Sequence, residues 1–445
     1  MKPKYERPVI VRHSLAGVNK FGPMPAVRPI VAIDGVRIAD LVAAHGSPLF
    51  VFSERSLRER VRELRGALSR RLASFELAWS YKTNYLGAIC RVFHQEGSLA
   101  EVVSGMELQM ALAAGVAGER ILFNGPYKSE SDLALAFKRQ VHVHIDHLDE
   151  LTLAEKVAER LGVRPEVGMR VNLSELPVPV WDRFGFNLES GRALEAARRI
   201  MRGGRLDLRT LHCHIGTFVT NPDVYRMVAR AMADLALTLE REIGSRIDTI
   251  DLGGGFASHN TLQSQYLPGD ESTPSLEEFV EALVSGLEEG LQGAEPRRLI
   301  LESGRALVDD AGYLILTVVG NKRLVDKRRA VILDGGVNIL PTAWWYRHDL
   351  QPAQDTFGTP EPTVFFGPLC MNIDVVRDRI LFPPLHVGDR IVVRHVGAYN
   401  VTQWMQFIAA RPNVVLVSPK GEHSVIRRAE TLEALQLHES IPSWL

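Results

Sequence analysis

Short apolar runs alternate with longer segments of helical periodicity from about residue 76 to residue 303. An apolar run of about four to eight residues bounded by turn signals is typical of a buried strand, and apolar residues spaced three and four apart indicate an amphipathic helix. The eight runs lie at residues 75–81, 98–102, 120–123, 141–145, 166–171, 208–213, 247–252 and 299–301.

The helical segments fall between these runs, at residues 84–95, 105–114, 146–161, 190–201, 223–242 and 275–291. Eight alternating strand and helix units predict an α/β fold, a closed parallel (β/α)8 barrel of the TIM type. An open doubly wound sheet is the structural alternative, but it does not require eight units.

The pattern changes after about residue 308. Five strand-like segments separated by Gly, Pro and Asn indicate an all-β domain, at residues 313–319, 330–334, 363–366, 390–396 and 414–416. Residues 30–33 also resemble a strand. We therefore expect two domains: a barrel over residues 45–307, and a sandwich-like or barrel-like β domain built from residues 20–44 and 308–445.

Composition and charge narrow the function classes. The 445 residues carry 52 Lys and Arg against 53 Asp and Glu, a net charge of −1, so we expect neither nucleic acid nor an anionic membrane as a partner. No apolar run approaches the roughly 20 residues of a membrane span. The start of the chain lacks a signal-type apolar segment, and Cys90, Cys213 and Cys370 are too few for a disulfide framework. A cytoplasmic location is the expectation.

Polar and glycine residues follow most of the predicted strands. Because the carboxyl ends of parallel barrel strands meet at one rim, where barrel enzymes place their chemistry, these residues are expected to converge. Lys82 follows the first strand, and a lysine at such a rim becomes nucleophilic enough to form a Schiff base if it loses solvation and gains cationic neighbours. A surface lysine with a solvated amine is the plainer alternative.

The residues that follow two further strands are suited to bind a phosphate and a cofactor ring. Gly253-Gly254-Gly255 follows the seventh strand, and backbone N–H groups freed of side chains can surround a phosphate; a simple tight turn is the alternative. Gly304-Arg305 after the eighth strand favours phosphate, since barrel enzymes often hold one between these two loops. Glu302 could pair with a cationic ring nitrogen, or form a salt bridge with Arg305 or Arg170.

His212 and His214 alternate on one strand and therefore share a face, where either could stack on a flat ring or bind a metal. A second group, His142, His144 and His147, is interpreted as structural because no carboxylate or cysteine completes a ligand set, and no metal is expected. Cys370 lies in a Gly-Pro loop of the β domain, where a buried packing role and a placed acid are both open.

Taken together, these motifs resemble the pyridoxal-phosphate-dependent decarboxylases of the diaminopimelate/ornithine decarboxylase family, which have the alanine-racemase-like fold (fold type III). The resemblance covers about residues 48–416. It rests on motifs in the family's order, namely Tyr81-Lys82-Thr83-Asn84, Val103-Ser104-Gly105-Met106-Glu107-Leu108, His212-Cys213-His214-Ile215-Gly216-Thr217, the triple glycine, Glu302-Ser303-Gly304-Arg305, Gly367-Pro368-Leu369-Cys370 and Gly397-Ala398-Tyr399.

The resemblance implies a role for each matched residue. Lys82 would carry pyridoxal 5'-phosphate as a Schiff base, His214 would stack on the pyridine ring, and Glu302 would pair with the ring nitrogen. Cys370 would reach in from the second subunit of a homodimer as the proton donor, so that each active site is complete only in the dimer. The cofactor's phosphate would be surrounded by Thr217, Gly253, Gly254, Gly255, Gly304, Arg305 and Tyr399.

Two substrate contacts depart from the family. Diaminopimelate decarboxylases have Cys-Glu-Ser where this chain has Cys370-Met371-Asn372, and that acid holds the distal amino group of the substrate. They also have Arg-Pro in place of Leu340-Pro341, and that arginine holds the distal carboxylate, for which a neutral residue is no substitute. Asp374 matches a family aspartate and could replace the missing acid, while Met371 and Trp344 would make the substrate pocket more apolar or larger.

We therefore predict an amino-acid decarboxylase with altered specificity, acting for example on a modified or carrier-tethered amino acid in siderophore or antibiotic assembly. A racemase on the same fold is one alternative, which the Gly-Pro-Leu-Cys370 loop disfavours. A non-catalytic decarboxylase-like binding protein is another, and the retention of Lys82, His214, Glu302 and Arg305 argues against it.

Overall fold

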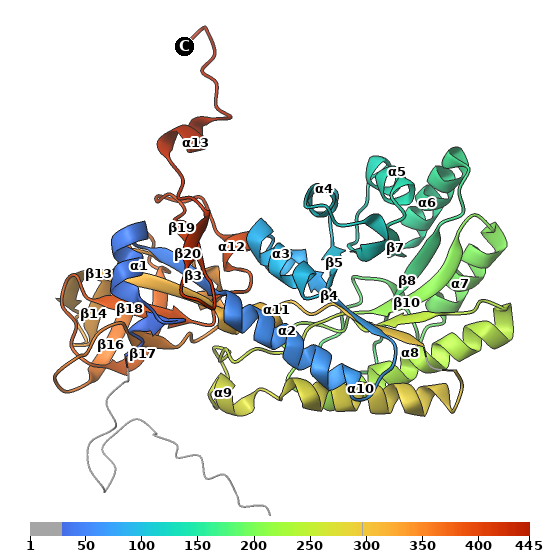
Figure 1. Cartoon of the computed structure of the whole chain (residues 1–445), viewed down its shortest axis with the longest axis horizontal. Coiled ribbons are helices and arrows are strands. Elements are labelled where there is room, and N and C mark those ends of the chain that lie inside the picture. Colours follow the sequence, from blue (N-terminus) through green and yellow to red (C-terminus); the bar gives the residue numbers. More distant parts are fainter. Residues whose placement is uncertain (1–28, 296) are drawn as a thin grey trace, which may run out of the picture.

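The computed structural model describes residues 29–295 and 297–445 (Figure 1). Its larger part is a closed barrel in which eight parallel strands pair in register, with the ring closed by β10 on β8 and by β12 on β4. The barrel strands are β4 (Phe75–Ser80), β5 (Leu99–Val102), β6 (Ile121–Phe123), β7 (His142–Ile145), β8 (Glu166–Asn172), β10 (Asp207–Cys213), β11 (Thr249–Asp251) and β12 (Arg298–Leu301). The predicted (β/α)8 barrel is confirmed, and a short strand β9 (Phe186–Asn187) extends it beside β8.

Amphipathic helices cover the outside of the barrel (Figure 1). Most of them begin at a side-chain cap, and Ser129 and Ser275 each form a reciprocal capping box with the residue three positions on. The long helices are α2 (Glu54–Ser69), α3 (Gly87–Gln95), α4 (Gly105–Ala113), α5 (Glu130–Lys138), α6 (Leu148–Leu161), α7 (Arg192–Gly203), α8 (Pro222–Ile243) and α10 (Leu276–Leu291). The sequence did not predict α2, which packs between α10 and α3 and covers the barrel where the chain leaves it after β12.

The second part is a nine-stranded, mostly antiparallel sheet, as the all-β prediction required. Its longest strand, β13, bends between two sets of partners: the first half pairs with β3 and β18, and the second half with β14. The strands are β3 (Leu49–Ser53), β13 (Gly312–Arg323), β14 (Arg329–Leu333), β15 (Leu350–Pro352), β16 (Glu361–Phe366), β17 (Val375–Phe382), β18 (Arg390–Arg394), β19 (Asn413–Val417) and β20 (His423–Arg427).

Strand β3 corrects one predicted boundary. Residues 45–53 were assigned to the barrel, but β3 is hydrogen-bonded to β13 and β19 in the second sheet, and all of its residues are buried there. A fully apolar strand gives the same pattern in a parallel barrel and in the centre of a second sheet, so the sequence could not separate the two. The barrel part of the chain begins after β3, with α2.

The N-terminal segment lies against the second sheet. Strands β1 (Ala32–Ile33) and β2 (Val36–Arg37) form a hairpin of their own, and helix α1 (Ile38–His45) follows. Ile33, Ile38 and Leu41 are buried in one apolar cluster with sheet residues such as Val51 and Ile315. Residues 20–28 of the predicted β-domain segment lie outside the described residues.

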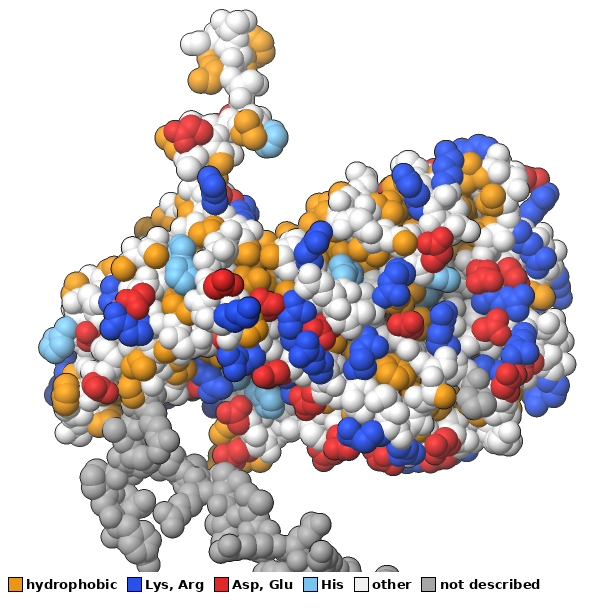
Figure 2. All heavy atoms as spheres, in the orientation of Figure 1, with side chains coloured by type: hydrophobic (Ala, Val, Ile, Leu, Met, Phe, Trp, Pro, Cys, Tyr) orange, Lys and Arg blue, Asp and Glu red, His pale blue; other side chains and the backbone are white. Residues whose placement is uncertain are grey.

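Short helices complete the described chain: α9 (Gly269–Ser272), α11 (Arg305–Val308), α12 (Asn400–Gln403) and α13 (Leu432–Gln436). The residues after β20, with α13, extend away from the body (Figure 1). Charged side chains of both signs are interspersed over the visible face (Figure 2), in keeping with the net charge of −1. Within residues 29–295 and 297–445, no helix combines the length and the apolar character needed to cross a membrane.

The barrel core yields a stability prediction. Trp79 on β4 is fully buried and stacks on Phe93 of α3, with ring centroids 3.7 Å apart and planes at 6°. Trp79→Ala should lower the free energy of unfolding by about 3–5 kcal/mol, because the variant loses the favourable burial of the indole and is left with a cavity in the core. Urea denaturation followed by circular dichroism measures the change. The matched control Trp444→Ala removes an exposed indole and should shift stability by less than about 0.5 kcal/mol; equal midpoints for the two variants would contradict the prediction.

Candidate functional site

A cavity of about 670 Å³ opens at the rim formed by the carboxyl ends of the barrel strands. Most residues predicted for the site converge on it, since Lys82, His214, Thr217, Gly255, Glu302, Gly304, Arg305 and Tyr399 all line its wall. Gly253 and Gly254 lie directly behind this wall, and the Gly254 N–H donates to His214 Nδ1 at 3.1 Å. Parallel strand closure thus brings Lys82 close to Arg305 although 223 positions separate them in the chain, and Tyr399 reaches the same cavity from the β domain.

Lys82 lies in a single 3-10 turn, Tyr81–Thr83, that ends strand β4 and turns the amine into the cavity. Its Nζ donates to both carboxylate oxygens of Glu101, at 2.9 and 2.7 Å. Burial opposes the charge, but Glu101, Tyr399 and Glu302 raise the pKa of Lys82 above its usual value. From the sequence we expected cationic neighbours around Lys82 and therefore a more nucleophilic amine. The neighbouring side chains are anionic instead, so they keep the free Lys82 amine protonated.

Gly254 and Gly255 make a close backbone crossing possible behind the cavity. A Cβ on Gly254 would lie 2.3 Å from the carbonyl oxygen of Glu302, and one on Gly255 would lie 2.3 Å from that of Gly216. Gly255 also has φ +96°, a conformation that residues with a side chain rarely adopt. The triple glycine is therefore required for the loops after β10, β11 and β12 to meet.

Arg305 carries the clearest sign of a missing anion. Its guanidinium is buried, and although Nη2 donates to Thr217 Oγ1 at 3.3 Å, Nε and Nη1 have no hydrogen-bond partner among the described residues. Aromatic rings surround it, with the Tyr399 centroid 4.7 Å and the Tyr346 centroid 5.4 Å from the guanidinium carbon. A buried, unpaired arginine is costly, and the phosphate of pyridoxal phosphate fits its charge and its free donors.

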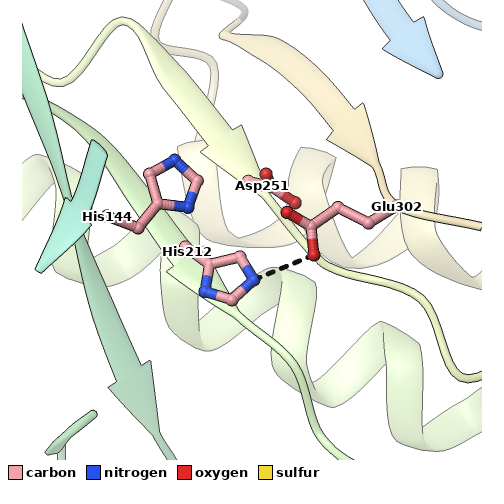
Figure 3. Close-up of side chains that lie close together, drawn as sticks. All are labelled: His144, His212, Asp251 and Glu302. Carbon is pink, nitrogen blue, oxygen red and sulfur yellow. Dashed lines mark hydrogen bonds and ion pairs between the residues drawn. The ribbon is translucent and has the colours of Figure 1, made fainter. Parts of the chain in front are cut away.

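Glu302 lies at the floor of the cavity in a buried network (Figure 3). Asn124 Nδ2 donates to Glu302 Oε1, and His212 Nε2 lies 3.2 Å from Oε2. Burial and the charge of Arg170 hold the pKa of His212 well below its usual value, so the ring is neutral and donates to the carboxylate. A carboxylate held in this way fits the protonated ring nitrogen of a pyridine cofactor.

Asp251 completes the network from the end of β11. Burial, followed by the charge of Glu302, raises the pKa of Asp251 well above its usual value, so this side chain is a neutral acid beside a carboxylate. Its Oδ1 accepts the N–H of Gly253 at 2.9 Å, while Oδ2 has no donor and is available to donate a proton to Glu302. Asp251 is therefore the protonated member of this carboxyl pair.

The sequence did not predict this cluster, because histidines close together in the chain were expected to act as one group. His144 belongs with His212, whose ring centroid is 4.9 Å away, rather than with His142 and His147. His147 is structural, since its ring caps α6 by accepting the Glu150 N–H at 3.2 Å. One ligand-type atom each from His144, His212, Asp251 and Glu302 lies within 4.8 Å of the others, a set that the prediction of no metal ligands did not anticipate.

His214 lines the cavity beside the indole of Trp181, with ring centroids 5.4 Å apart in an edge-on arrangement. Burial and the charges of Arg170 and Lys82 hold the pKa of His214 well below its usual value, so the ring is neutral. A neutral imidazole that accepts a backbone N–H is fixed in orientation, as a stacking platform for a flat cofactor ring requires.

The predicted β-domain residues lie away from this cavity. Cys370 is exposed, and neither it nor Met371, Asp374 or Trp344 is among the lining residues of the same chain. Asp374 is buried, and its two oxygens accept the N–H groups of Val337 and Leu369, each at 2.8 Å. The carboxylate predicted to replace the substrate contact is thus occupied in holding the Cys370 loop against the sheet.

Several side chains that line the cavity were not predicted from the sequence. Trp345, Tyr346 and Gln403 line the cavity from the β domain, next to the predicted Trp344, which is 43% exposed. Trp181 and Phe184 line it from the loop between β8 and β9. That loop has neither helical nor strand periodicity, so only its aromatic residues among prolines could have signalled a binding role.

Comparisons with known proteins agree with this geometry. Residues 54–309 match the family described as "Pyridoxal-dependent decarboxylase, pyridoxal binding domain". The diaminopimelate decarboxylase of Methanocaldococcus jannaschii is 30% identical over 430 residues, which cover 93% of this chain and 95% of that protein. The diaminopimelate decarboxylase of Mycobacterium tuberculosis is 30% identical over 431 residues, covering 91% and 94%.

Solved structures give the same picture. The M. jannaschii diaminopimelate decarboxylase in complex with L-lysine is 28% identical and superposes with a TM-score of 0.85, covering 93% of this chain and 96% of that chain. A lysine/ornithine decarboxylase from Vibrio vulnificus, complexed with putrescine, is 22% identical with a TM-score of 0.71, covers 86% and 96%, and shares the fold.

The unpaired guanidinium leads to a prediction about cofactor affinity. Arg305→Met should weaken the binding of pyridoxal phosphate about 10- to 100-fold, because a charge-assisted hydrogen bond contributes about 1.5–3 kcal/mol. Titration of the cofactor-free protein, followed by cofactor absorbance, gives the dissociation constant. Arg192→Met removes an exposed arginine of α7 and should leave it unchanged. Wild-type affinity in the Arg305→Met variant would show that the phosphate lies elsewhere.

Proposed function

Because the chain belongs to the pyridoxal-dependent decarboxylases, we propose that it removes the α-carboxylate of an amino acid other than diaminopimelate. Its activity class is that of a carboxy-lyase acting on an amino acid, and its cofactor is pyridoxal 5'-phosphate. The observation that carries the substrate proposal is the loss of both distal-group contacts, at Leu340 and Met371, in a site that keeps the cofactor residues.

Different residues around the first cavity would hold different parts of the cofactor. Pyridoxal phosphate, when bound, supplies a conjugated ring that accepts the electron pair left on the substrate as CO2 departs. Lys82 would hold the cofactor covalently, and Arg305, Thr217 and the glycines would hold its phosphate. Glu302 would keep the ring nitrogen protonated, because Asn124, His212 and Asp251 hold its carboxylate in place, and His214 would hold the ring face.

Cys370 would return a proton to the substrate carbon from the second subunit of a homodimer. Its exposure supports this role, as does its absence from the lining of the cavity in its own subunit. Gly336 and Gly367 abut the Asp374 carboxylate so closely that a Cβ on either would lie within 2.3 Å of it, so the loop packs tightly around this side chain. A tightly packed loop that presents a thiol at the surface suits a group that acts in a neighbouring site.

The walls of the cavity support a less polar substrate side chain. Trp181, Phe184, Phe218, Leu262 and Trp345 all line it. Leu340, at the position of the family's arginine, is fully buried in the core and offers no charge to a distal carboxylate. We include in the proposal a specialised or carrier-tethered amino acid of siderophore or antibiotic assembly, handled in the cytoplasm, where the free thiols of Cys90, Cys213 and Cys370 stay reduced.

A substrate panel tests the specificity. Release of CO2 from meso-diaminopimelate should have a kcat/KM at least about 100-fold below that of the best amino acid tested, because a bidentate arginine contact and an acid contact are both missing. The panel should include lysine, ornithine, arginine, aromatic amino acids and carrier-linked forms. Rapid turnover of meso-diaminopimelate would overturn the altered specificity, and inversion of an amino acid without CO2 release would instead identify a racemase.

Subunit complementation tests the shared site. Lys82→Ala and Cys370→Ala should each lower activity more than about 100-fold as pure proteins, in line with the loss of a covalent or acid–base group. When the two are mixed and allowed to exchange subunits, half of the dimers are hybrids with one intact site each, so about a quarter of wild-type activity should return. Mixing Lys82→Ala with Glu302→Ala is the matched control, since both residues would lie in the same subunit's site, so that each site of a hybrid carries one of the two changes and no activity should return. If the Cys370 mixture likewise recovers nothing although the subunits exchange, Cys370 acts within its own subunit.

A further inference from the structure

A second cavity, of about 320 Å³, lies where the barrel meets the β domain and shares no lining residue with the first. Residues 259–270, from the loop after β11, form one wall. Arg347, His348 and Asp349, which precede β15, form another, and Arg377 with Ile380 of β17 and His395 close it. No role in the proposed decarboxylation involves these residues.

Arg377 is the unusual member of this lining. Its Nε and Nη1 are shielded from solvent without a partner, and its side chain forms no hydrogen bond or ion pair with any described residue. Burial and the charge of the nearby Arg347 lower the pKa of Arg377 to about 10. Arg347 donates from Nη2 to the carbonyl oxygen of Gln265, but its own Nε is also buried and unpartnered. Arg347 and Arg377 thus line one cavity, and each keeps at least one buried guanidinium nitrogen without a partner among the described residues.

The acidic groups around the cavity are already engaged. Asp349 accepts from Arg394 Nη1 at 3.0 Å. Asp310, behind the wall, accepts from His259 at 2.6 Å and from His395 at 2.7 Å; although burial disfavours its charge, these two bonds lower the pKa of Asp310. His348 is buried and neutral, with a pKa lowered to about 3 by burial and His395. Asp270 is exposed at the cavity mouth. The charges of Asp349 and Asp378 favour the charged form of Arg377, but these carboxylates accept hydrogen bonds from Arg394 and Arg328, so neither Arg377 nor Arg347 has an acidic hydrogen-bond partner among the described residues.

We propose that this cavity binds a small oxyanion, a carboxylate or phosphate group held between the guanidinium groups of Arg347 and Arg377. Leaving two arginines unpaired in a partly buried site costs stability, and an anion that accepts from both repays that cost. Planar guanidinium donors match the oxygen geometry of carboxylates and phosphates. A volume of about 320 Å³ admits a small organic acid or phosphate ester and excludes a polymer.

The test uses the enzyme loaded with pyridoxal phosphate, so that the Arg305 cradle is occupied and cannot bind the probe. Inorganic phosphate and succinate are titrated separately at constant ionic strength, with binding heat and melting temperature as readouts. We expect saturable binding of at least one probe with a dissociation constant below about 10 mM. Arg377→Gln should weaken it about tenfold or more, and Arg347→Gln should have a similar effect.

Arg379→Gln is the matched control, because it removes an arginine of the same strand whose side chain is 80% exposed. It should bind the probe as the wild type does. In the absence of the probe, Arg377→Gln should melt no lower than the wild type, since it removes an unpaired buried charge; a merely structural arginine would show a loss.

Three results would overturn the proposal. One is the absence of saturable binding of either probe to the wild type, and another is unchanged binding in both cavity variants. The third is a change of oligomeric state in Arg377→Gln or Arg347→Gln without anion binding, which would assign the two arginines to an acidic side chain of a second copy. Binding of phosphate alone or of succinate alone supports the site and identifies its ligand as a phosphate or a carboxylate.

Discussion

Closure of the parallel barrel is the constraint on which the site depends. The ring closes only when β12 pairs with β4 and β10 pairs with β8 in parallel register, and this places every strand's carboxyl end at the same rim. Lys82 from the first strand and Glu302 from the last then face one cavity, although 220 residues separate them. The glycines at 254 and 255 allow the loops to approach at distances that any side chain would prevent.

Several charged side chains inside this rim would gain partners from a bound cofactor. Arg305 keeps free donors in a buried position, and Glu302 keeps a carboxylate at the floor with a neutral acid, Asp251, and a neutral ring, His212, beside it. Lys82 meanwhile is paired with Glu101. Burying guanidinium nitrogens without partners costs stability, and a bound phosphate would offset that cost, so cofactor binding would stabilise the folded chain around Arg305.

Local pattern was enough to predict the barrel strands and most of the strand-end residues that line the first cavity, because each strand is a short buried run and these residues follow shortly after one. The sequence could not assign β3, since a fully apolar strand has no face that distinguishes one sheet from another. It also could not reveal that both carboxylate oxygens of Asp374 accept backbone N–H groups, or that the ring of His144 lies beside that of His212, because both contacts join segments that are distant in the chain. The second cavity, formed by arginines on separate β-domain segments, leaves no local signal at all.

The division between the two domains explains how chemistry can be retained while specificity changes. The groups suited to the cofactor lie at barrel strand ends, where a shift of any one residue would disturb a closed sheet. The residues that stand where the resemblance places the family's substrate contacts, Leu340 and Met371, lie on β-domain segments outside the barrel. Leu340 is packed into the core, and the Met371 loop is anchored by Asp374 independently of the residue at 371. A substitution at 371 therefore alters what the loop presents without altering how the loop is held, so substrate range can change while the cofactor site stays the same.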